Sequence, residues 1–283
     1  MQSFGKVEQP KNRHRLRLRL GMTYFTFRRH MRWRFGGLKF AKICHGGQDG
    51  GFAHTYFAHQ TLLLRQLKDV DMQMQHNKII NLRIALTKIG GAVIMPGETL
   101  SYWRLIGRPT RRKGYVDGMV LDKGVVTAGV GGGLCQLSNL IYWMTLHTPL
   151  TVTERHRHSY DVFPDSGRTQ PFGSGATCFY NYGDLMIRND TKTPFRLALG
   201  LTDTHLTGEW LATAPPMCTY EVYEKAHLIR SEFWGGYTRH NVICRRKFDL
   251  GGNLVDDEFI TENHAIMMYA PLLTDINHSA PLH

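Results

Sequence analysis

The sequence predicts an α+β fold, in which a helix starting near Cys135 packs on a largely antiparallel sheet that includes residues 150–155 and 176–182. A basic, helical segment is expected at the N-terminus. Three observations lead to this prediction. A glycine-rich loop precedes a helical apolar pattern over residues 135–147, which ends near Pro149. Short runs of β-forming residues follow, separated by Asp, Asn, Gly and Pro, as is typical of antiparallel strands. The first 42 residues are strongly basic.

The earlier part of the chain predicts a second helix. Apolar residues recur at steps of three and four over residues 61–89, where Asp69 or Asp71 is placed to cap the second half and two consecutive glycines end the pattern. His54 and His59 precede this segment, and we interpret them as residues on a helix surface rather than ligands.

Most other elements are predicted to be strands. The predicted strands are residues 92–95, 116–121, 125–128, 150–155, 176–182, 185–189, 195–201, 206–211 and 220–223. Residues 236–269 predict a further hairpin, with its turn at Gly251 and Gly252.

Charge divides the chain into an arm and a main body. The 283 residues include 35 Lys+Arg and 23 Asp+Glu, for a formal net charge of +12. Residues 1–42 hold twelve of the basic residues and one acid, so this segment carries +11 of that charge. We therefore expect a basic, aromatic-rich arm over residues 1–45 and a folded domain over residues 46–283. Hydrophobic residues make up 42% of the chain, which excludes disorder as its global state.

Neither a membrane span nor a disulfide framework is predicted. No apolar run approaches the roughly 18 residues of a membrane span, and the N-terminus lacks an apolar stretch followed by a small-residue cleavage site. The five cysteines contain no CxxC pair, so we expect free thiols in a reducing compartment. The expected location is the cytoplasm, with association at the inner face of the membrane.

The arm predicts contact with an anionic partner through residues 13–42. Residues 13–20 alternate strictly, which in an extended chain places leucines on one face and arginines on the other. Aromatic residues then interleave with arginines, a combination that suits anionic lipid or nucleic acid. We favour a membrane surface, because no nucleic-acid-binding motif accompanies the charge. The alternative is a solvated segment whose aromatic side packs on the body.

Cys135 is the main candidate for a catalytic residue. It follows Gly131, Gly132 and Gly133 and begins the predicted helix, where the helix dipole favours thiolate over thiol. Amides at the start of this helix, with the side chain of Gln136, form the predicted oxyanion site. A cysteine nucleophile in such a site performs acyl transfer or hydrolysis.

Two histidines follow at the end of a predicted strand. His156 and His158 would share one face of that strand, so either could serve as the base for Cys135, and His158 is preferred. Arg155 and Ser159 lie beside them and are predicted to contact the substrate. The orienting group for the base is left open among three residues, Glu154, Asp161 and Asn189.

Three other roles for this region stay open. The glycines also permit tight packing of helix on sheet, with Cys135 as a small buried residue. Cys135, His156 and His158 are residue types that bind zinc, but no fourth ligand and no CxxC pair accompany them, so no metal is predicted. The glycine loop loosely resembles a dinucleotide site, but Leu134 occupies its sixth fingerprint position, so no cofactor is predicted.

Several motifs follow one another in a distinctive order across nearly half the chain. They are Asn77-Lys78, Asn81-Leu82, Pro96-Gly97-Glu98-Thr99-Leu100-Ser101, Gly107, Gly114-Tyr115, Gly131-Gly132-Gly133-Leu134-Cys135-Gln136, Glu154-Arg155-His156-Arg157-His158-Ser159, Gly175-Ala176-Thr177, Asp184-Leu185 and Asn189. In this order they resemble the VanW family. The resemblance covers a core of about residues 77–201 within the domain at 46–283, and a β-rich extension follows over residues 213–269.

The resemblance implies an association with vancomycin resistance and names no reaction. It favours peptidoglycan or one of its precursors as the substrate of a Cys135 site. The alternative is a non-catalytic cell-envelope accessory or ligand-binding protein, in which the glycine loop and Cys135 are structural. The family pattern usually has an acid just before the Ala-Thr pair, and Gly175 occupies that place here.

Overall fold

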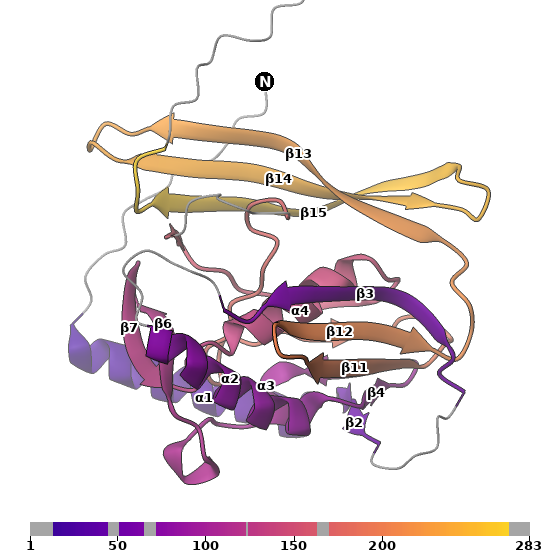
Figure 1. Cartoon of the computed structure of the whole chain (residues 1–283), viewed down its shortest axis with the longest axis horizontal. Helices are drawn as coiled ribbons and strands as arrows, with labels where there is room; N and C mark the ends of the chain where they lie inside the picture. Colours follow the sequence, from indigo (N-terminus) through magenta and orange to yellow (C-terminus); the bar gives the residue numbers. More distant parts are fainter. Residues whose placement is uncertain (1–13, 45–50, 65–71, 123, 163–169, 272–283) are drawn as a thin grey trace, which may run out of the picture.

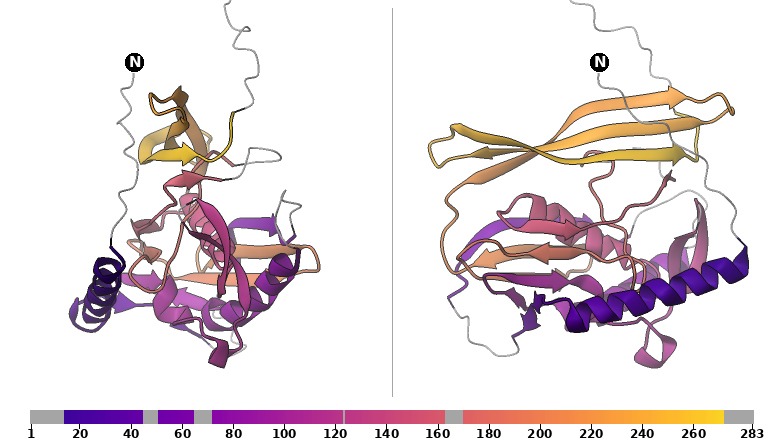
Figure 2. Two further views of the ribbon diagram at one scale, coloured as in Figure 1. Left: turned by 90° about the vertical axis from the view of Figure 1, so that its left-hand side faces the viewer. Right: turned by 180° about the vertical axis from the view of Figure 1, so that it is seen from behind.

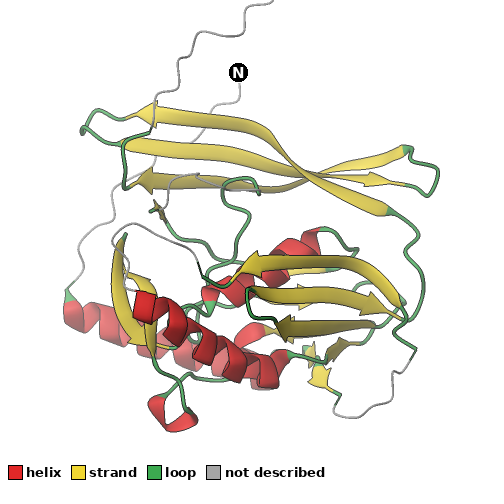
Figure 3. Cartoon of the chain, viewed as in Figure 1, coloured by secondary structure: helices red, strands yellow, loops and turns green. Residues whose placement is uncertain are grey.

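The computed structural model describes residues 14–44, 51–64, 72–122, 124–162 and 170–271, and it has an α+β architecture in which most paired strands are antiparallel (Figures 1 and 3). The predicted fold class is confirmed. The helices are α1 (Arg15–Phe35), α2 (Met72–Ile89), α3 (Tyr102–Ile106) and α4 (Cys135–Leu146), with a 3₁₀ turn over Arg111–Lys113.

The strands form three sheets and a hairpin. The first sheet has the order β2 (Lys42–Ile43), β4 (Ala92–Ile94), β11 (Phe195–Leu201), β12 (His205–Ala212) and β3 (His54–Leu62). The second has the order β1 (Lys39–Phe40), β5 (Glu98–Ser101), β10 (Met186–Arg188) and β8 (Thr151–Glu154). The third has the order β13 (Thr219–Ser231), β14 (Tyr237–Phe248), β15 (Leu254–Met267) and β9 (Tyr160–Asp161), and the hairpin pairs β6 (Asp117–Asp122) with β7 (Val125–Val130).

The long strands β13 to β15 lie along one side of a body that holds the helices and the first two sheets (Figure 1). Figure 2 shows α1 on the outside of this body, at its edge in the left view and across its front in the right view, and below β13 to β15 in both. Residues 15–35 of the basic segment therefore form a helix on the outside of the molecule.

The main core lies between α4 and the first sheet. α4 buries Leu137, Leu140, Ile141 and Met144, whose steps of three, one and three residues put them on the face toward β3 and β12. Trp210 of β12 is fully buried there, and its indole N–H donates to the hydroxyl of a buried threonine on α4 at 3.2 Å. The predicted packing of this helix on an antiparallel sheet is confirmed, but β8, which was expected in that sheet, belongs to the second sheet.

One predicted strand in this region is wrong. Residues 176–182 form an irregular segment in which Phe179 and Gly183 make an isolated bridge. The backbone of Ala176 bonds to side chains of α4 instead of a neighbouring strand: its N–H donates to Asn139 Oδ1 at 2.8 Å, and its carbonyl accepts from Ser138 Oγ at 2.6 Å. Because α4 supplies partners for both backbone polar groups of Ala176, the start of this segment does not need a neighbouring strand.

The helix predicted over residues 61–89 is wrong in its first part. α2 begins at Met72, whereas Thr61 belongs to β3, and the proposed caps Asp69 and Asp71 lie outside the described residues. β3 also contains His54 and His59, which therefore lie on a strand and not on a helix. This strand forms because it pairs along its length with β12, a partner far away in the sequence.

The alternation over residues 13–20 also does not produce an extended chain. Residues 15–20 are the first turns of α1, and the helix begins after His14, whose ring accepts from the Leu16 N–H. Leucine and arginine are both strong helix formers, so intrinsic propensity prevails over a short alternating pattern.

A buried asparagine joins α2 to the glycine loop. Asn81 is fully buried, and its Nδ2 donates to the carbonyls of Val116 and Gly132 at 3.0 and 2.9 Å. Its Oδ1 accepts from the Val116 N–H at 2.9 Å. One side chain therefore makes hydrogen bonds with three backbone groups that lie outside helices and strands.

Replacing Asn81 with alanine should lower the free energy of unfolding by about 3 kcal/mol, because it leaves the Gly132 carbonyl and the Val116 N–H without partners. Urea unfolding followed by tryptophan fluorescence measures this loss. Asn77→Ala is the matched control, since its Nδ2 makes a bond of 2.7 Å to a single carbonyl, that of Asp117, and should cost about 1 kcal/mol. Equal losses in the two variants would contradict the assigned role of Asn81.

Candidate functional site

The glycine loop that precedes α4 is closely packed. Gly131 and Gly133 have φ values of 78° and 89°, which L side chains rarely adopt. A Cβ on Gly132 would lie 2.1 Å from the carbonyl carbon of Gly118, and one on Gly133 would lie 2.2 Å from Cγ of Lys78. The glycines therefore let the β6–β7 hairpin and α2 approach the start of α4.

Three backbone amides and one side-chain amide of this loop donate to partners within the protein. The backbone amides of Gly131, Gly132 and Gln136 each donate to a backbone carbonyl at 3.0 Å. The side-chain amide of Gln136 donates to Thr61 Oγ1 at 2.9 Å and to the Leu62 carbonyl at 2.8 Å. Both amides of Gln136, which the sequence assigned to an oxyanion site, hold the fold together.

Cys135 lies at the first position of α4, as the sequence predicted, but its surroundings favour the thiol. The residue is half-buried, and its Sγ lies 3.9 Å from the carbonyl oxygen of Cys178. Burial raises the pKa of Cys135, in spite of the opposing contribution of backbone hydrogen bonds. The expected lowering of this pKa by the helix dipole is therefore outweighed by desolvation. Burial also raises the pKa of Cys178, well above its usual range.

The two predicted bases do not share a strand face. β8 ends at Glu154, so His156 and His158 follow it in an irregular segment where alternation does not apply. His156 Nε2 lies 3.1 Å from Glu154 Oε1, whereas burial and the charge of Arg157 lower the pKa of His158. Across the described ranges, no hydrogen bond joins the Cys135 thiol to either imidazole.

Arg155 and Ser159 have structural partners. The Arg155 guanidinium donates to the carbonyls of Gly173 and Gly175 and to Thr261 Oγ1 of β15, the last at 3.0 Å. Its Cζ lies 4.7 Å from the ring centroid of Tyr142 on α4. Ser159 is exposed, and its carbonyl accepts from the N–H of a β15 residue at 2.9 Å. Arg155 thus joins α4, a glycine-containing loop and the third sheet.

The position where the family pattern has an acid is crowded. A Cβ on Gly175 would lie 2.6 Å from Oδ1 of Asn139. That same oxygen accepts the Ala176 N–H, so a larger residue at 175 would disturb the contact between this segment and α4.

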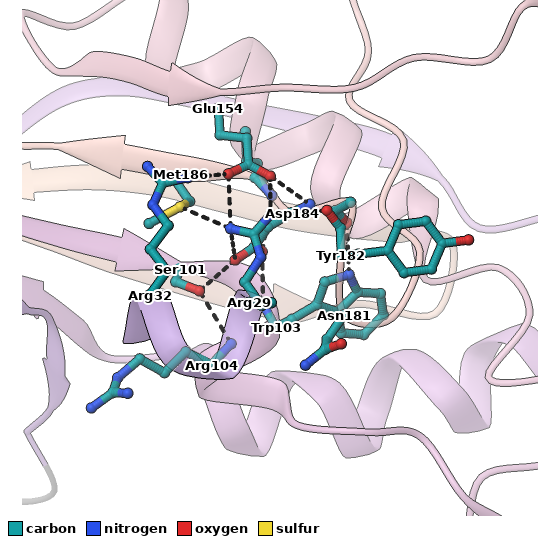
Figure 4. A network of polar contacts seen from close by, with 12 residues as sticks. Arg29, Arg32, Ser101, Trp103, Arg104, Glu154, Asn181, Tyr182, Asp184 and Met186 are labelled. Carbon is teal, nitrogen blue, oxygen red and sulfur yellow. Dashed lines mark hydrogen bonds and ion pairs between the residues drawn. The ribbon is translucent and has the colours of Figure 1, made fainter. Parts of the chain in front are cut away.

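Glu154 is the centre of a buried polar network, which Figure 4 shows from close by. Both of its carboxylate oxygens accept from the Arg29 guanidinium of α1, and Arg32 adds a bond of 3.0 Å. The Asp184 amide donates to it at 3.2 Å, and His156 makes the contact described above. Burial opposes ionisation, but the hydrogen bonds from His156 and Arg29 lower the pKa of Glu154 to about 2.

A second acid, Asp184, lies within the same network and behaves differently. It is fully buried, and it accepts from Ser101 Oγ at 2.5 Å and from the Trp103 amide at 2.9 Å. Arg29 Nη1 is 4.0 Å from its Oδ2. Burial raises the pKa of Asp184 to about 6, because these contacts only partly offset desolvation.

Sequence reasoning found only part of this network. Glu154 was one of three candidates to orient a histidine, and the structure places it against His156. The other two candidates have different partners: Asp161 contacts Arg239 and Tyr269, and Asn189 bonds to backbone and side-chain groups around residues 94 and 191–193. The ion pair with Arg29 was not predicted, because nothing in the sequence indicates which arginine of the arm turns inward.

Chemically, the network offers an imidazole held by a carboxylate. Such a pair is the usual arrangement of a general base, and the His156 side chain is 39% exposed. Within the described residues, no group of three His, Cys, Asp or Glu side chains is placed to hold a metal ion. Cys135, His156 and His158 therefore do not form a zinc site in this structure.

Known proteins resemble this chain over most of its length. Residues 77–211 match a family model described as VanW like protein. The chain is 31% identical over 239 residues to the vancomycin B-type resistance protein VanW of Enterococcus faecalis, which covers 83% of this chain and 86% of the relative. The chain belongs to the VanW family. The predicted family core, residues 77–201, lies within the matched range.

A second known protein is similar to a smaller part of this chain. The uncharacterized protein YoaR of Bacillus subtilis is 30% identical over 114 residues, which cover 40% of this chain and 36% of that protein. No solved structure matches the chain.

Replacing Asp184 with asparagine should change how stability depends on pH. The pKa of Asp184 is about 6 in the folded protein, against an ordinary value of 3.8. Between these two pH values the folded carboxyl keeps its proton, whereas the carboxyl of the unfolded chain has lost it. Its contribution to the free energy of unfolding therefore falls as pH rises through that interval, by about 3 kcal/mol at roughly 1.4 kcal/mol per unit. Asparagine does not titrate, so urea unfolding should show the wild-type value fall by this amount relative to Asp184→Asn.

Asp190→Asn is the control for this measurement. Asp190 is an exposed carboxyl whose pKa is lowered by its hydrogen bond with Arg188, so its contribution does not fall with rising pH. A difference between wild type and Asp184→Asn that stays constant with pH would contradict the assignment of Asp184 as a buried acid.

Proposed function

We propose that this VanW family protein serves vancomycin resistance as a non-catalytic accessory of the cell envelope that binds a peptidoglycan precursor. The name of its Enterococcus relative supplies the connection with vancomycin resistance. In this proposal the glycine loop and Cys135 are structural, and the protein acts by binding.

The observation that carries the proposal is that amides of the loop before α4 donate hydrogen bonds to other groups of the protein. Gly131, Gly132 and Gln136 direct their amides to partners inside the protein, and the Gln136 side chain holds β3. An oxyanion site needs donors that point at the reacting oxygen and have no other partner. Burial also raises the pKa of Cys135, which opposes the formation of a nucleophilic thiolate.

A second candidate function is cysteine-dependent acyl transfer or hydrolysis at the same place. It is favoured by the position of Cys135 at the start of α4 and by the carboxylate that holds His156. For this function the Cys135 thiol and an imidazole would have to meet when substrate binds. The two candidates differ in the reactivity of one thiol.

Alkylation of the full chain distinguishes the two candidates. With iodoacetamide near pH 6, Cys135 should be labelled more slowly than the exposed Cys44 and no faster than the buried Cys178 and Cys244. Its labelling rate should rise only at alkaline pH, because its pKa is raised. Mass spectrometry of peptides after timed quenching gives the four rates.

The opposite result would support the enzyme. If Cys135 is labelled faster than Cys44 near pH 6, and if His156→Ala or His158→Ala slows that labelling in a folded protein, the non-catalytic proposal fails.

Binding supplies an independent measurement. Titration calorimetry with a soluble muramyl-pentapeptide precursor should give the same dissociation constant for the wild type and for Cys135→Ala, and the recovered peptide should be intact. Absence of binding in both proteins, or cleavage that Cys135→Ala abolishes, would contradict the proposed function.

A further inference from the structure

One face of α1 attaches this helix to the body. Arg29 is only 7% exposed and makes the ion pair with Glu154, while Trp33 packs against the main core. His30 Nε2 lies 3.0 Å from the Nδ2 of Asn181, and the ring centroids of Phe25 and Tyr182 are 6.2 Å apart. Figure 4 shows Arg29 and Arg32 reaching inward from the helix.

A different face of α1 carries exposed apolar side chains in one continuous stripe. They recur at steps of four, four, three, four and four residues, which places them one above another along a helix. The residues of this stripe are Leu16, Leu20, Tyr24, Phe27, Met31 and Phe35, each between 41% and 73% exposed. A contiguous apolar surface of this kind marks an interaction site more often than scattered exposed residues do.

Exposed arginines flank the apolar stripe on both sides. At 100° per residue, Arg17 and Arg28 lie along one edge, and Arg19 and Arg34 lie along the other. α1 contains no acidic residue, so every formally charged side chain on its exposed surface is positive. Long arginine side chains can keep their charge at the level of phosphate groups while the helix beneath them enters an apolar layer.

We propose that α1 lies in the plane of an anionic lipid bilayer surface, with the apolar stripe inserted at the boundary between headgroups and acyl chains. The flanking arginines would bind lipid phosphates, and the aromatic members of the stripe suit the interfacial layer. α1 has 21 residues and so extends about 31 Å along the surface. None of the helices in the described part of the chain is long and apolar enough to cross a bilayer.

Two features favour lipid over another occupant of the stripe. The arginines on both edges match a surface of closely spaced phosphates, whereas a second copy of this chain would bring like charge against like charge. The bonds of Arg29 and Arg32 to Glu154 also fix α1 to the body of the protein, with the apolar stripe on the exposed side of the helix. The proposal concerns attachment to the surface and is independent of what the protein binds there.

Sedimentation of the full chain with vesicles tests the proposal. The wild type should sediment with vesicles of phosphatidylcholine and phosphatidylglycerol at low salt, sediment less at high salt, and remain in solution with phosphatidylcholine alone. Replacement of Leu20, Phe27 and Met31 by serine should abolish sedimentation. These side chains are exposed, so circular dichroism should show an unchanged fold.

Matched controls separate the stripe from general surface effects. Serine at Phe233, Leu250 and Phe259, which are 99%, 70% and 64% exposed on the β13–β15 hairpins, should leave sedimentation unchanged. Arg17→Gln with Arg28→Gln should weaken vesicle binding about 30-fold, at roughly fivefold for each charge. Arg83→Gln with Arg112→Gln, which removes two exposed charges elsewhere, should have a much smaller effect.

Three outcomes would overturn the proposal. One is equal sedimentation of the wild type and the stripe variant. Another is a concentration-dependent dimer in sedimentation velocity that the stripe variant loses, which would make a second copy the occupant. The third is wild-type binding to duplex DNA with no binding to anionic vesicles, which would assign the arginines to nucleic acid.

Discussion

The ionised carboxylate of Glu154 connects three parts of the chain that are distant in the sequence or belong to different elements. It stands at the end of β8 and receives hydrogen bonds from two arginines of α1, from His156 and from the Asp184 amide. A mostly buried charge is stable only with such partners, because removing one of them leaves an uncompensated ion away from water. The N-terminal helix, the loop after β8 and the segment before β10 therefore all bond to a single group.

The neighbouring Asp184 shows how finely the same environment differentiates two acids. Glu154 has direct contact with guanidinium groups, whereas Asp184 is deeper and depends on a hydroxyl and backbone amides. The pKa values of the two carboxyls move in opposite directions as a result, to about 2 and about 6. The difference between the two pKa values comes from the balance between desolvation and the hydrogen-bond donors around each carboxyl, and not from the proximity of the two carboxyls.

The glycine loop follows a related rule. Close approach of β6, α2 and α4 places several backbone groups out of reach of water, and Asn81 and neighbouring carbonyls satisfy them. The amides of Gly131, Gly132 and Gln136, which belong to a motif that looks like an anion or oxyanion site in the sequence, thus have partners within the protein itself. The apolar stripe of α1 is the contrasting case, since its side chains are left exposed along the whole helix.

Several features of this protein were determined by the sequence itself. The start of α4 at Cys135, the β11–β12 and β14–β15 hairpins and the concentration of charge near the N-terminus all follow from glycines, periodicity and composition within short segments. Such local preferences act before any tertiary contact forms. The family also follows from motifs that are visible in the sequence alone.

Only the tertiary structure decided the rest. β3 is a strand because β12 pairs with it, and the backbone of Ala176 bonds to side chains of α4 instead of a strand. Cys135 lies beside the Cys178 carbonyl while His156 turns to Glu154, a choice that depends on packing among residues distant in the sequence. Which arginine of α1 is buried, and which face stays exposed, depends likewise on where Glu154 lies. Hydrogen bonds and burial between distant segments set these outcomes, and no local pattern encodes them.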